Sequence, residues 1–255
     1  MKPDMSKLKD MVYIESGPFI MGSDESPNEK PCRTVELAPF YIDRYPVTNR
    51  AYRQFIEDGG YRTPKHWSAD GWNFVQARNL QFPLYWLDDH WNADVQPVTG
   101  VSWWEACAFA KYLGKQLPTE AQWENAARGT DGRRYPWGDD EPTAEHALYA
   151  IDCDPTELRR RSASVYAFPL GASPCGGMDF AGNVGEWCQD NASANYVWDI
   201  TCLDPRYWTA EEDDHIVRGG SGLHNEDYLR CSSRDYYPPT LRDNIVGFRC
   251  VIDEK

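Results

Sequence analysis

The end of the chain constrains its fold most strongly. The motif Arg218-Gly219-Gly220-Ser221 is followed, after a long irregular stretch, by Gly247-Phe248-Arg249. The residues between the two motifs have neither the period of a helix nor the alternation of a strand. Such a segment keeps one conformation only if the rest of a domain supports it, and long ordered loops are often binding surfaces. We therefore expect residues 217–250 to face a ligand.

The composition favours a loop-rich domain. The 255 residues include 11 Trp, 15 Tyr, 19 Gly and 18 Pro, which suits aromatic side chains packed beneath irregular backbone better than it suits a helical bundle. We find no linker, repeat or low-complexity stretch. One domain covering residues 1–255 is therefore predicted.

The charge argues against two classes of partner. The net charge is −14, and the only basic cluster, residues 159–161, is set among acids. Nucleic-acid and anionic-membrane binders need a basic face, so neither partner is expected. The N-terminus is charged, and no apolar run is long enough for a signal peptide or a membrane span. We expect a cytoplasmic protein.

Turn and capping residues predict the local elements. Two short strands around a turn are expected at residues 12–14 and 17–22, and another at 40–43. A helix should start after Thr48 and end at Gly59-Gly60.

Two further helices are predicted by capping boxes, one formed by Ser102 and Glu105, the other by Thr119 and Gln122. Residues 61–98 contain many aromatics but little periodicity, so an aromatic-rich loop insertion is expected there. The predicted class is α+β, with two or three helices, small twisted sheets and much coil.

Several motifs together resemble one family. In chain order they are Phe19-Ile20-Met21-Gly22-Ser23, Pro46-Val47-Thr48-Asn49, Pro97-Val98 with Val101-Ser102-Trp103, Leu117-Pro118-Thr119-Glu120-Ala121-Gln122-Trp123-Glu124, Tyr135-Pro136-Trp137-Gly138, Gly182-Asn183-Val184-Gly185-Glu186-Trp187, Arg218-Gly219-Gly220-Ser221 and Gly247-Phe248-Arg249. This series resembles the sulfatase-modifying-factor family, which includes the formylglycine-generating enzyme. The resemblance implies a C-type-lectin-like fold elaborated with extra loops.

The resemblance to the formylglycine-generating enzyme fails at its metal. That enzyme oxidises a substrate cysteine with copper held by two thiolates shortly after the Gly-Gly-Ser element, and soft sulfur ligands suit Cu(I). Residues 222–230 contain no cysteine, and Cys231 alone cannot replace a thiolate pair. We expect neither bound copper nor formylglycine-generating activity.

Residues 59–61, 71–72 and 83–86 look more like a second branch, the C-terminal domain of ergothioneine-pathway sulfoxide synthases. Those enzymes bind iron through three histidines, mostly from a separate helical domain. The histidines of this chain are His66, His90, His146, His215 and His224, and no two have metal-ligand spacing. Iron is therefore not expected in this chain alone. The resemblance still implies an alternative, a metal-dependent oxidoreductase acting with a partner, in which Arg242 contacts a carboxylate or the substrate.

The C-terminal segment is also similar to variable proteins of diversity-generating retroelements. Their diversified residues lie between the same two motifs and belong to types that adenine-directed mutation produces. Most candidate positions here fit, but Glu226 departs, and Gly222 stands where an aromatic residue is usual. The predicted ligand-binding residues are Leu223, His224, Asn225, Tyr228, Asp235, Tyr236, Tyr237, Leu241, Arg242, Asp243 and Asn244.

A calcium site is implied near residue 180. Asp179, Gly182, Val184 and Glu186 match the family's calcium segment, and carboxylates with turn carbonyls suit Ca²⁺. The alternative is that Asp179 and Glu186 merely cap turns.

Other side chains in the terminal segment have two interpretations. For Arg218, Arg234 and Arg249 we favour salt bridges that hold the loops, whereas Arg230 and Arg242 stay open. The group Tyr228, Tyr236, Tyr237 and His224 either forms an exposed binding face or packs beneath residues 61–98.

The 8 cysteines include no C-x-x-C pair. Cys107 and Cys250 stand near a disulfide implied by the family resemblance, yet a reducing compartment predicts free thiols.

These observations favour a binding module. It would present residues 222–245 to a protein, a peptide or a small molecule. The alternative is the partner-dependent oxidoreductase described above.

Overall fold

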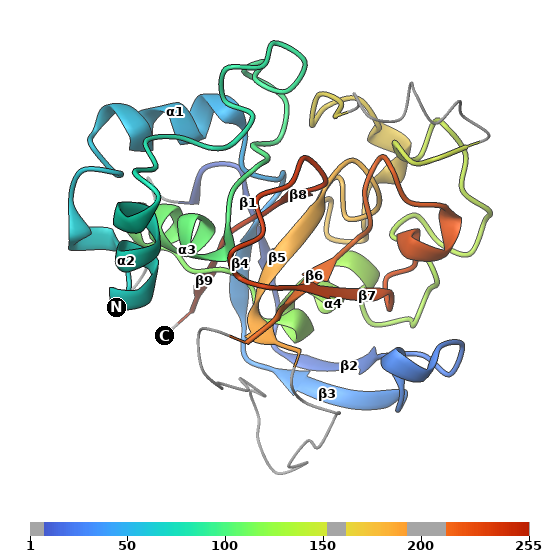
Figure 1. Cartoon of the computed structure of the whole chain (residues 1–255). Helices are drawn as coiled ribbons and strands as arrows, with labels where there is room; N and C mark the ends of the chain where they lie inside the picture. The colour runs from blue at the N-terminus through green and yellow to red at the C-terminus, as the bar shows by residue number, and fades with distance from the viewer. Residues whose placement is uncertain (1–7, 152–161, 193–212, 255) are drawn as a thin grey trace.

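A computed structural model describes residues 8–151, 162–192 and 213–254. Its α+β architecture combines four α-helices with three small sheets and much coil (Figure 1). The helices are α1 (Asn49–Glu57), α2 (Ala69–Ala77), α3 (Trp103–Tyr112) and α4 (Glu120–Arg128). The strands are β1 (Met11–Ile14), β2 (Gly17–Met21), β3 (Arg33–Leu37), β4 (Phe40–Asp43), β5 (Gly185–Asn191), β6 (His215–Arg218), β7 (Arg234–Tyr237), β8 (Val246–Gly247) and β9 (Val251–Asp253). The predicted class is confirmed.

The three helix starts read from the sequence are confirmed. Thr48 Oγ1 accepts the N–H of Ala51 at the start of α1. Both predicted capping boxes close completely, at Ser102 and Glu105 for α3 and at Thr119 and Gln122 for α4. Reciprocal side-chain bonds of this kind satisfy N–H groups that would otherwise have no partner.

The prediction for residues 61–98 was wrong in one respect, because this stretch contains α2. Ser68 caps α2 by accepting the N–H of Gly71. The Phe74 ring lies 4.8 Å from the Trp104 ring, so α2 owes its place to packing on α3. The aromatic part of the prediction holds, since Trp67 and Trp91 are buried and Trp67 Nε1 donates to Gly60 O at 2.8 Å.

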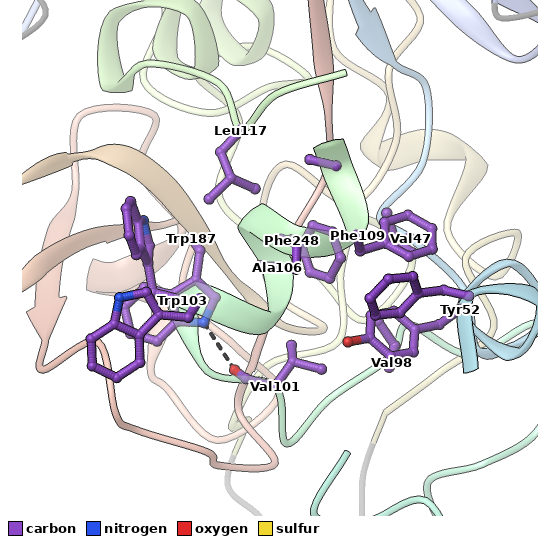
Figure 2. Packing of buried hydrophobic residues seen from close by; sticks show 14 of the residues in the cluster. Val47, Tyr52, Val98, Val101, Trp103, Ala106, Phe109, Leu117, Trp187 and Phe248 are labelled. Atoms are coloured by element: carbon purple, nitrogen blue, oxygen red, sulfur yellow. Dashed lines mark hydrogen bonds between the residues drawn. The ribbon is translucent and has the colours of Figure 1, made fainter. Parts of the chain in front are cut away.

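The terminal Gly-Phe-Arg motif anchors the chain end in the larger core cluster. Figure 2 shows Phe248 among the core side chains, and its ring centroid lies 5.5 Å from that of Phe109 and 6.3 Å from that of Tyr52. In the same cluster, Trp187 Nε1 donates to Val101 O at 3.1 Å. The irregular C-terminal segment is thus fixed at its end by a fully buried aromatic side chain.

The four-stranded sheet, in the order β7-β6-β5-β8, positions the terminal segment. Strand β6 is antiparallel to both β5 and β7, and β8 is parallel to β5. The start of β5, the end of β6, the start of β7 and the start of β8 therefore share one edge. Loop 219–233 and the end of loop 238–245 meet at that edge. In Figure 1, α1 and α2 lie to one side of this sheet.

Within the described residues, no helix combines the length and the apolar character needed to cross a bilayer.

Candidate functional site

Two glycines turn the chain at the shared edge of the sheet. Gly219 and Gly220 have φ angles of 91° and 66°, in a region that favours glycine. A Cβ on Gly220 would lie 2.9 Å from both the Cβ and the carbonyl oxygen of Tyr228. The glycine pair therefore lets the short 3₁₀ helix Glu226–Leu229 fold back against the end of β6.

A small pocket opens where these segments meet. Its volume is about 10 Å³, enough for about one water molecule. The backbones of Gly185, Gly219 and Gly220 form part of the wall, together with apolar side chains from β6 and β8. The polar side chains in the wall are His224, Tyr228, Ser233, Asp235 and Tyr237. Four of the eleven predicted ligand-binding residues are thus brought together around one pocket.

His224 is a neutral base beside this pocket. Its Nδ1 forms a hydrogen bond with Ser221 Oγ at 3.0 Å, and its ring stacks on Tyr228 with centroids 4.4 Å apart. Burial lowers the pKa of His224 below its ordinary value, although the charge of Asp235 acts in the opposite sense. The imidazole is therefore uncharged at neutral pH and can accept or donate a hydrogen bond.

Asp235 and Tyr237 form a polar pair on one face of β7. Because these residues are two positions apart on a strand, their side chains point to the same side. Tyr237 OH donates to Asp235 Oδ2 at 2.6 Å. Burial, with the hydrogen bond to Asp235, raises the pKa of Tyr237, so this phenol stays protonated.

The exposed-face and packing interpretations apply to different tyrosines of the terminal segment. Tyr236 points the other way along β7 and is 53% exposed, and Tyr228 is 37% exposed. Tyr237 instead packs against the main core cluster, with its ring 6.5 Å from that of Trp187. The exposed-face interpretation therefore fits Tyr228 and Tyr236, whereas Tyr237 is a packing residue with a polar tip.

Loop 238–245 is held against α3 and lies partly outside the pocket. Arg242 forms an ion pair with Glu105, with Nε 2.9 Å from Oε2, and its Nη2 donates to Phe82 O at 2.6 Å. Asp243 O accepts the N–H of Gly100 at 2.9 Å. Leu241 packs against the main core cluster. Arg242 is thus engaged within the fold, while Leu223, Asn225 and Asn244 do not line the pocket.

The remaining arginines of the segment are structural, as predicted for three of them. Arg218 is fully buried between Glu120 and Glu124, and Arg234 also binds Glu120. Arg249 forms two hydrogen bonds with Glu186, at 2.6 and 2.7 Å. Arg230, which the sequence left open, pairs with Glu29 in the same two-bond manner at 2.7 and 2.8 Å. Such paired geometry fixes the loops to the body of the molecule.

The predicted calcium residues lie together, but one carboxylate is already paired. Both oxygens of Glu186 accept from Arg249, and Oε2 also accepts from Trp123 Nε1 at 2.8 Å. Asp179 accepts from Asn183 Nδ2 at 2.9 Å, and burial raises the pKa of Asp179 to about 7. A site built on Asp179, Gly182, Val184 and Glu186 would compete with Arg249 for Glu186, and calcium stays a prediction.

The donor set near the Gly-Gly-Ser element does not fit a two-thiolate copper site. Cys231 is fully buried, and burial raises the pKa of its thiol to about 12. Burial also raises the pKa values of Cys188 and Cys250. No disulfide joins Cys107 and Cys250. Cys153 and Cys202 lie outside the described residues.

The histidines likewise do not converge. His66 contacts the Tyr112 ring, His146 stacks on Trp137, and His215 stacks on Trp103. His90 pairs with Asp88, and His224 stacks on Tyr228. Among the described residues, no group of three His, Cys, Asp or Glu side chains could hold a metal ion.

Sequence reasoning missed part of the pocket. Ser221 and Ser233 sit in irregular loop, where no periodicity assigns a facing direction. Gly185 and Val246 reach the pocket only because β8 pairs with β5 across a long sequence separation. A signal existed for Ser221 and Gly185, since each belongs to a motif read from the sequence.

Comparison with known proteins agrees with this architecture. A model of the sulfatase-modifying factor enzyme 1-like domain matches residues 1–254. The hercynine oxygenase of Mycolicibacterium thermoresistibile is 35% identical, and the match covers 95% of this chain but only 58% of that protein. The formylglycine-generating enzyme of Thermomonospora curvata is 34% identical, with 96% of this chain and 94% of the relative covered.

Two solved structures share the fold. PvdO from Pseudomonas aeruginosa superposes with a TM-score of 0.68 at 22% identity, covering 96% of this chain and 94% of PvdO. Treponema denticola variable protein 1 gives a TM-score of 0.67 at 20% identity, covering 96% and 95%. The expected C-type-lectin-like α+β fold of the formylglycine-generating-enzyme type is therefore confirmed.

Proposed function

This chain belongs to the sulfatase-modifying factor enzyme 1-like family, and we propose that within it the chain is a binding module. It presents residues 222–245 to a protein, a peptide or a small molecule. The observation that carries this proposal is the arrangement at the sheet edge. Exposed Tyr228 lines a pocket with a neutral imidazole and a carboxylate, and Tyr236 is exposed on the other face of β7. Buried ion pairs hold the loops around them.

Such a surface has the properties of a recognition site. Tyrosine offers a large contact area with little loss of side-chain entropy and one polar group at its tip. The buried arginines hold the loops that carry these side chains, so less conformational entropy is lost on binding. The chain's net charge of −14 supports a partner other than nucleic acid.

The donor chemistry of the terminal segment supports a binding module over a copper enzyme. In the described residues, the cysteines near the terminal motif are buried thiols, and loop 222–230 carries none. The stretch that presents two thiolates in the formylglycine-generating enzyme here presents His224 and Tyr228 instead. His224 and Tyr228 can recognise a ligand through hydrogen bonds and ring contacts, without a bound metal.

The proposal is tested by selecting ligands and then removing the exposed tyrosines. A displayed random peptide library is panned on the full chain, and the enriched peptides are measured against the Tyr228→Ala/Tyr236→Ala double variant. The matched control is Tyr166→Ala, because Tyr166 is 59% exposed on a different loop. We expect the double variant to lose about tenfold or more in affinity, as for aromatic residues at the centre of an interface, and the control to lose none.

Equal affinities of the double variant and the Tyr166→Ala control would contradict the proposal. So would a failure to enrich any peptide together with no binder in a small-molecule screen of the same chain.

A second function is favoured by one observation, the 35% identity to a hercynine oxygenase. The match covers 58% of that relative's length, so the activity of the whole relative is proposed here only together with a partner. A partner that supplied metal ligands could use the pocket at His224 and Asp235 to position a substrate. Iron bound in stoichiometric amount by a complex with such a partner, and not by the chain alone, would favour this second function.

A further inference from the structure

A second cavity lies away from the C-terminal pocket, between the end of α1, Tyr61 and α2. Its volume is about 440 Å³, within the roughly 300–1,000 Å³ that is common for small-molecule sites. It shares no lining residue with the pocket at His224. No residue of the proposed binding surface at residues 222–245 lines this cavity.

Three aromatic side chains, Tyr61, Trp72 and Phe82, line the cavity together with Ile56 and Leu80. Aromatic and aliphatic walls of this kind favour a flat ring, which they can contact over a large area.

The back of the cavity is held rigidly by buried hydrogen bonds. Tyr61 OH donates to Glu105 Oε1 at 2.5 Å, and Tyr52 OH lies 3.0 Å from Tyr61 OH. Burial raises the pKa values of both phenols far above the ordinary value, so both stay protonated. Arg242 Nη2 donates to Phe82 O at 2.6 Å, which holds the opposite wall. Tyr61 and the backbone at Phe82 are therefore held in place before a ligand binds.

The polar side chains of the cavity point to an anionic ligand. Arg62 is the only charged residue in its lining, and it is accompanied by the amides of Gln76, Asn79 and Gln81. None of these four side chains has a hydrogen bond or an ion pair to another of the described residues. A guanidinium binds a carboxylate through two parallel hydrogen bonds, and amides can donate to and accept from ring substituents.

We propose that this cavity, bounded by α1, Tyr61–Arg62 and α2–Phe82, is a second binding site that takes a small aromatic or heteroaromatic carboxylate. The ring lies against Trp72 and Tyr61, and the carboxylate binds Arg62. The amides of Gln76 and Asn79 select polar substituents on the ring.

The test uses a matched pair of probes, 6-fluoro-2-naphthoate and 6-fluoro-2-naphthamide, titrated into the full chain by fluorine NMR. We expect the carboxylate to bind about five- to tenfold more tightly than the amide, since a partly exposed guanidinium–carboxylate pair contributes modestly. Arg62→Gln should abolish this preference. Arg50→Gln, an exposed arginine on α1 outside the cavity lining, should leave it unchanged.

A cavity-filling variant shows where the probes bind. Leu80→Trp should weaken both probes at least fivefold, while circular dichroism and the melting temperature confirm that the chain is folded. The proposal is overturned if neither probe binds below about 10 mM, a free energy near −3 kcal/mol. It is also overturned if Arg62→Gln and Arg50→Gln have equal effects, or if Leu80→Trp leaves both affinities unchanged. The Tyr228→Ala/Tyr236→Ala variant should bind both probes normally, so this test and that of the C-terminal surface can fail separately.

Discussion

Buried arginines hold the irregular C-terminal segment to the rest of the molecule. Arg249 is fully buried, pairs with Glu186, and places its guanidinium 3.7 Å from the centroid of the Phe180 ring. It also donates to Met178 O at 2.7 Å. One side chain thus joins the terminal motif to the loop backbone at Met178.

Replacing Arg249 tests this role. Arg249→Met leaves the Glu186 carboxylate buried without its cation, so we expect the free energy of unfolding to fall by about 3–5 kcal/mol. Urea denaturation followed by tryptophan fluorescence measures the change. Arg50→Met serves as control, because its pair with Asp94 is exposed and should be worth less than about 1 kcal/mol. Equal losses in the two variants would refute the structural role of Arg249.

Asp190 gives the stability a specific pH dependence. Burial, and next the charge of Glu120, raise the pKa of Asp190 to about 7, although the N–H of Glu120 donates to Asp190 Oδ2 at 2.6 Å. The unfolded value is about 4. Between about pH 4 and 7 the folded state therefore binds more protons than the unfolded state, and the contribution of Asp190 lowers stability as pH rises through this window.

The expected result is a less negative slope of the free energy of unfolding against pH for Asp190→Asn than for the unchanged chain between pH 4.5 and 7.5. The asparagine stays neutral at every pH, and its amide oxygen can still accept from the N–H of Glu120. Urea denaturation at a series of pH values measures the slope. A slope unchanged by the substitution would show that Asp190 is ionised throughout in the folded chain.

Residue types were predictable where charge or capping chemistry left few alternatives. The structural role of Arg218, Arg234 and Arg249 followed from many donors placed among coil and acids. Arg242 could not be assigned from sequence, because its partner Glu105 lies 137 positions away. The role of Arg242 therefore depends on which residue lies next to it in the fold, and its residue type alone does not reveal this.

At the scale of elements, the glycine turn after β6 controls the shape of the pocket. Gly220→Ala introduces a Cβ that meets Tyr228 at 2.9 Å and a side chain at a φ of 66°. We expect a loss of stability of about 1–3 kcal/mol, together with a displacement of the 3₁₀ helix that carries Tyr228.

Gly176→Ala is a control that introduces backbone strain at a positive φ without a steric clash. Gly176 has a φ of 81°, but nothing lies within 4 Å of its hypothetical Cβ. Gly220→Ala should therefore cost more than Gly176→Ala, and only Gly220→Ala should shift the NMR signals of the His224 ring. If the two variants lost equal stability and the His224 signals did not move, the close approach of Tyr228 would not be needed for the pocket.

Three capped helices were predicted, and α2 was not, although Ser68 caps it. Helices α1, α3 and α4 begin at Thr48, Ser102 and Thr119, and each cap could be read directly. Helix α2 contains Gly71 and Asn73, which are poor helix formers, so its stability comes from packing against Trp104. That contact is tertiary, and local sequence does not reveal it.

At the scale of the whole molecule, a sheet brings distant segments to one edge. Strands β5 and β8 pair in parallel, and β6 lies between β5 and β7. The motifs at both ends of the terminal segment were visible in sequence, and their order predicted the family and the fold. The pocket at their meeting point was not visible, since it depends on strand pairing across long separations.

The scaffold and the terminal loops are separate enough that one fold can carry different chemistry. The buried ion pairs and the Phe248 anchor support the terminal loops without taking part in the exposed surface. Loop residues such as His224, Tyr228 and Tyr236 can therefore change while the scaffold is kept, which is the usual relation between a fold and its sites.

The central claim is that the terminal loops recognise a ligand without a thiolate-bound redox metal. The most direct measurement is metal analysis of the chain purified under anaerobic, reducing conditions, followed by titration with Cu(I) in the presence of a Cu(I) chelator. We expect far less than one copper or iron ion per chain, and Cu(I) should stay with the chelator. One tightly held transition-metal ion per chain, with the ultraviolet absorption of copper–thiolate bonds or with histidine ligation, would contradict it.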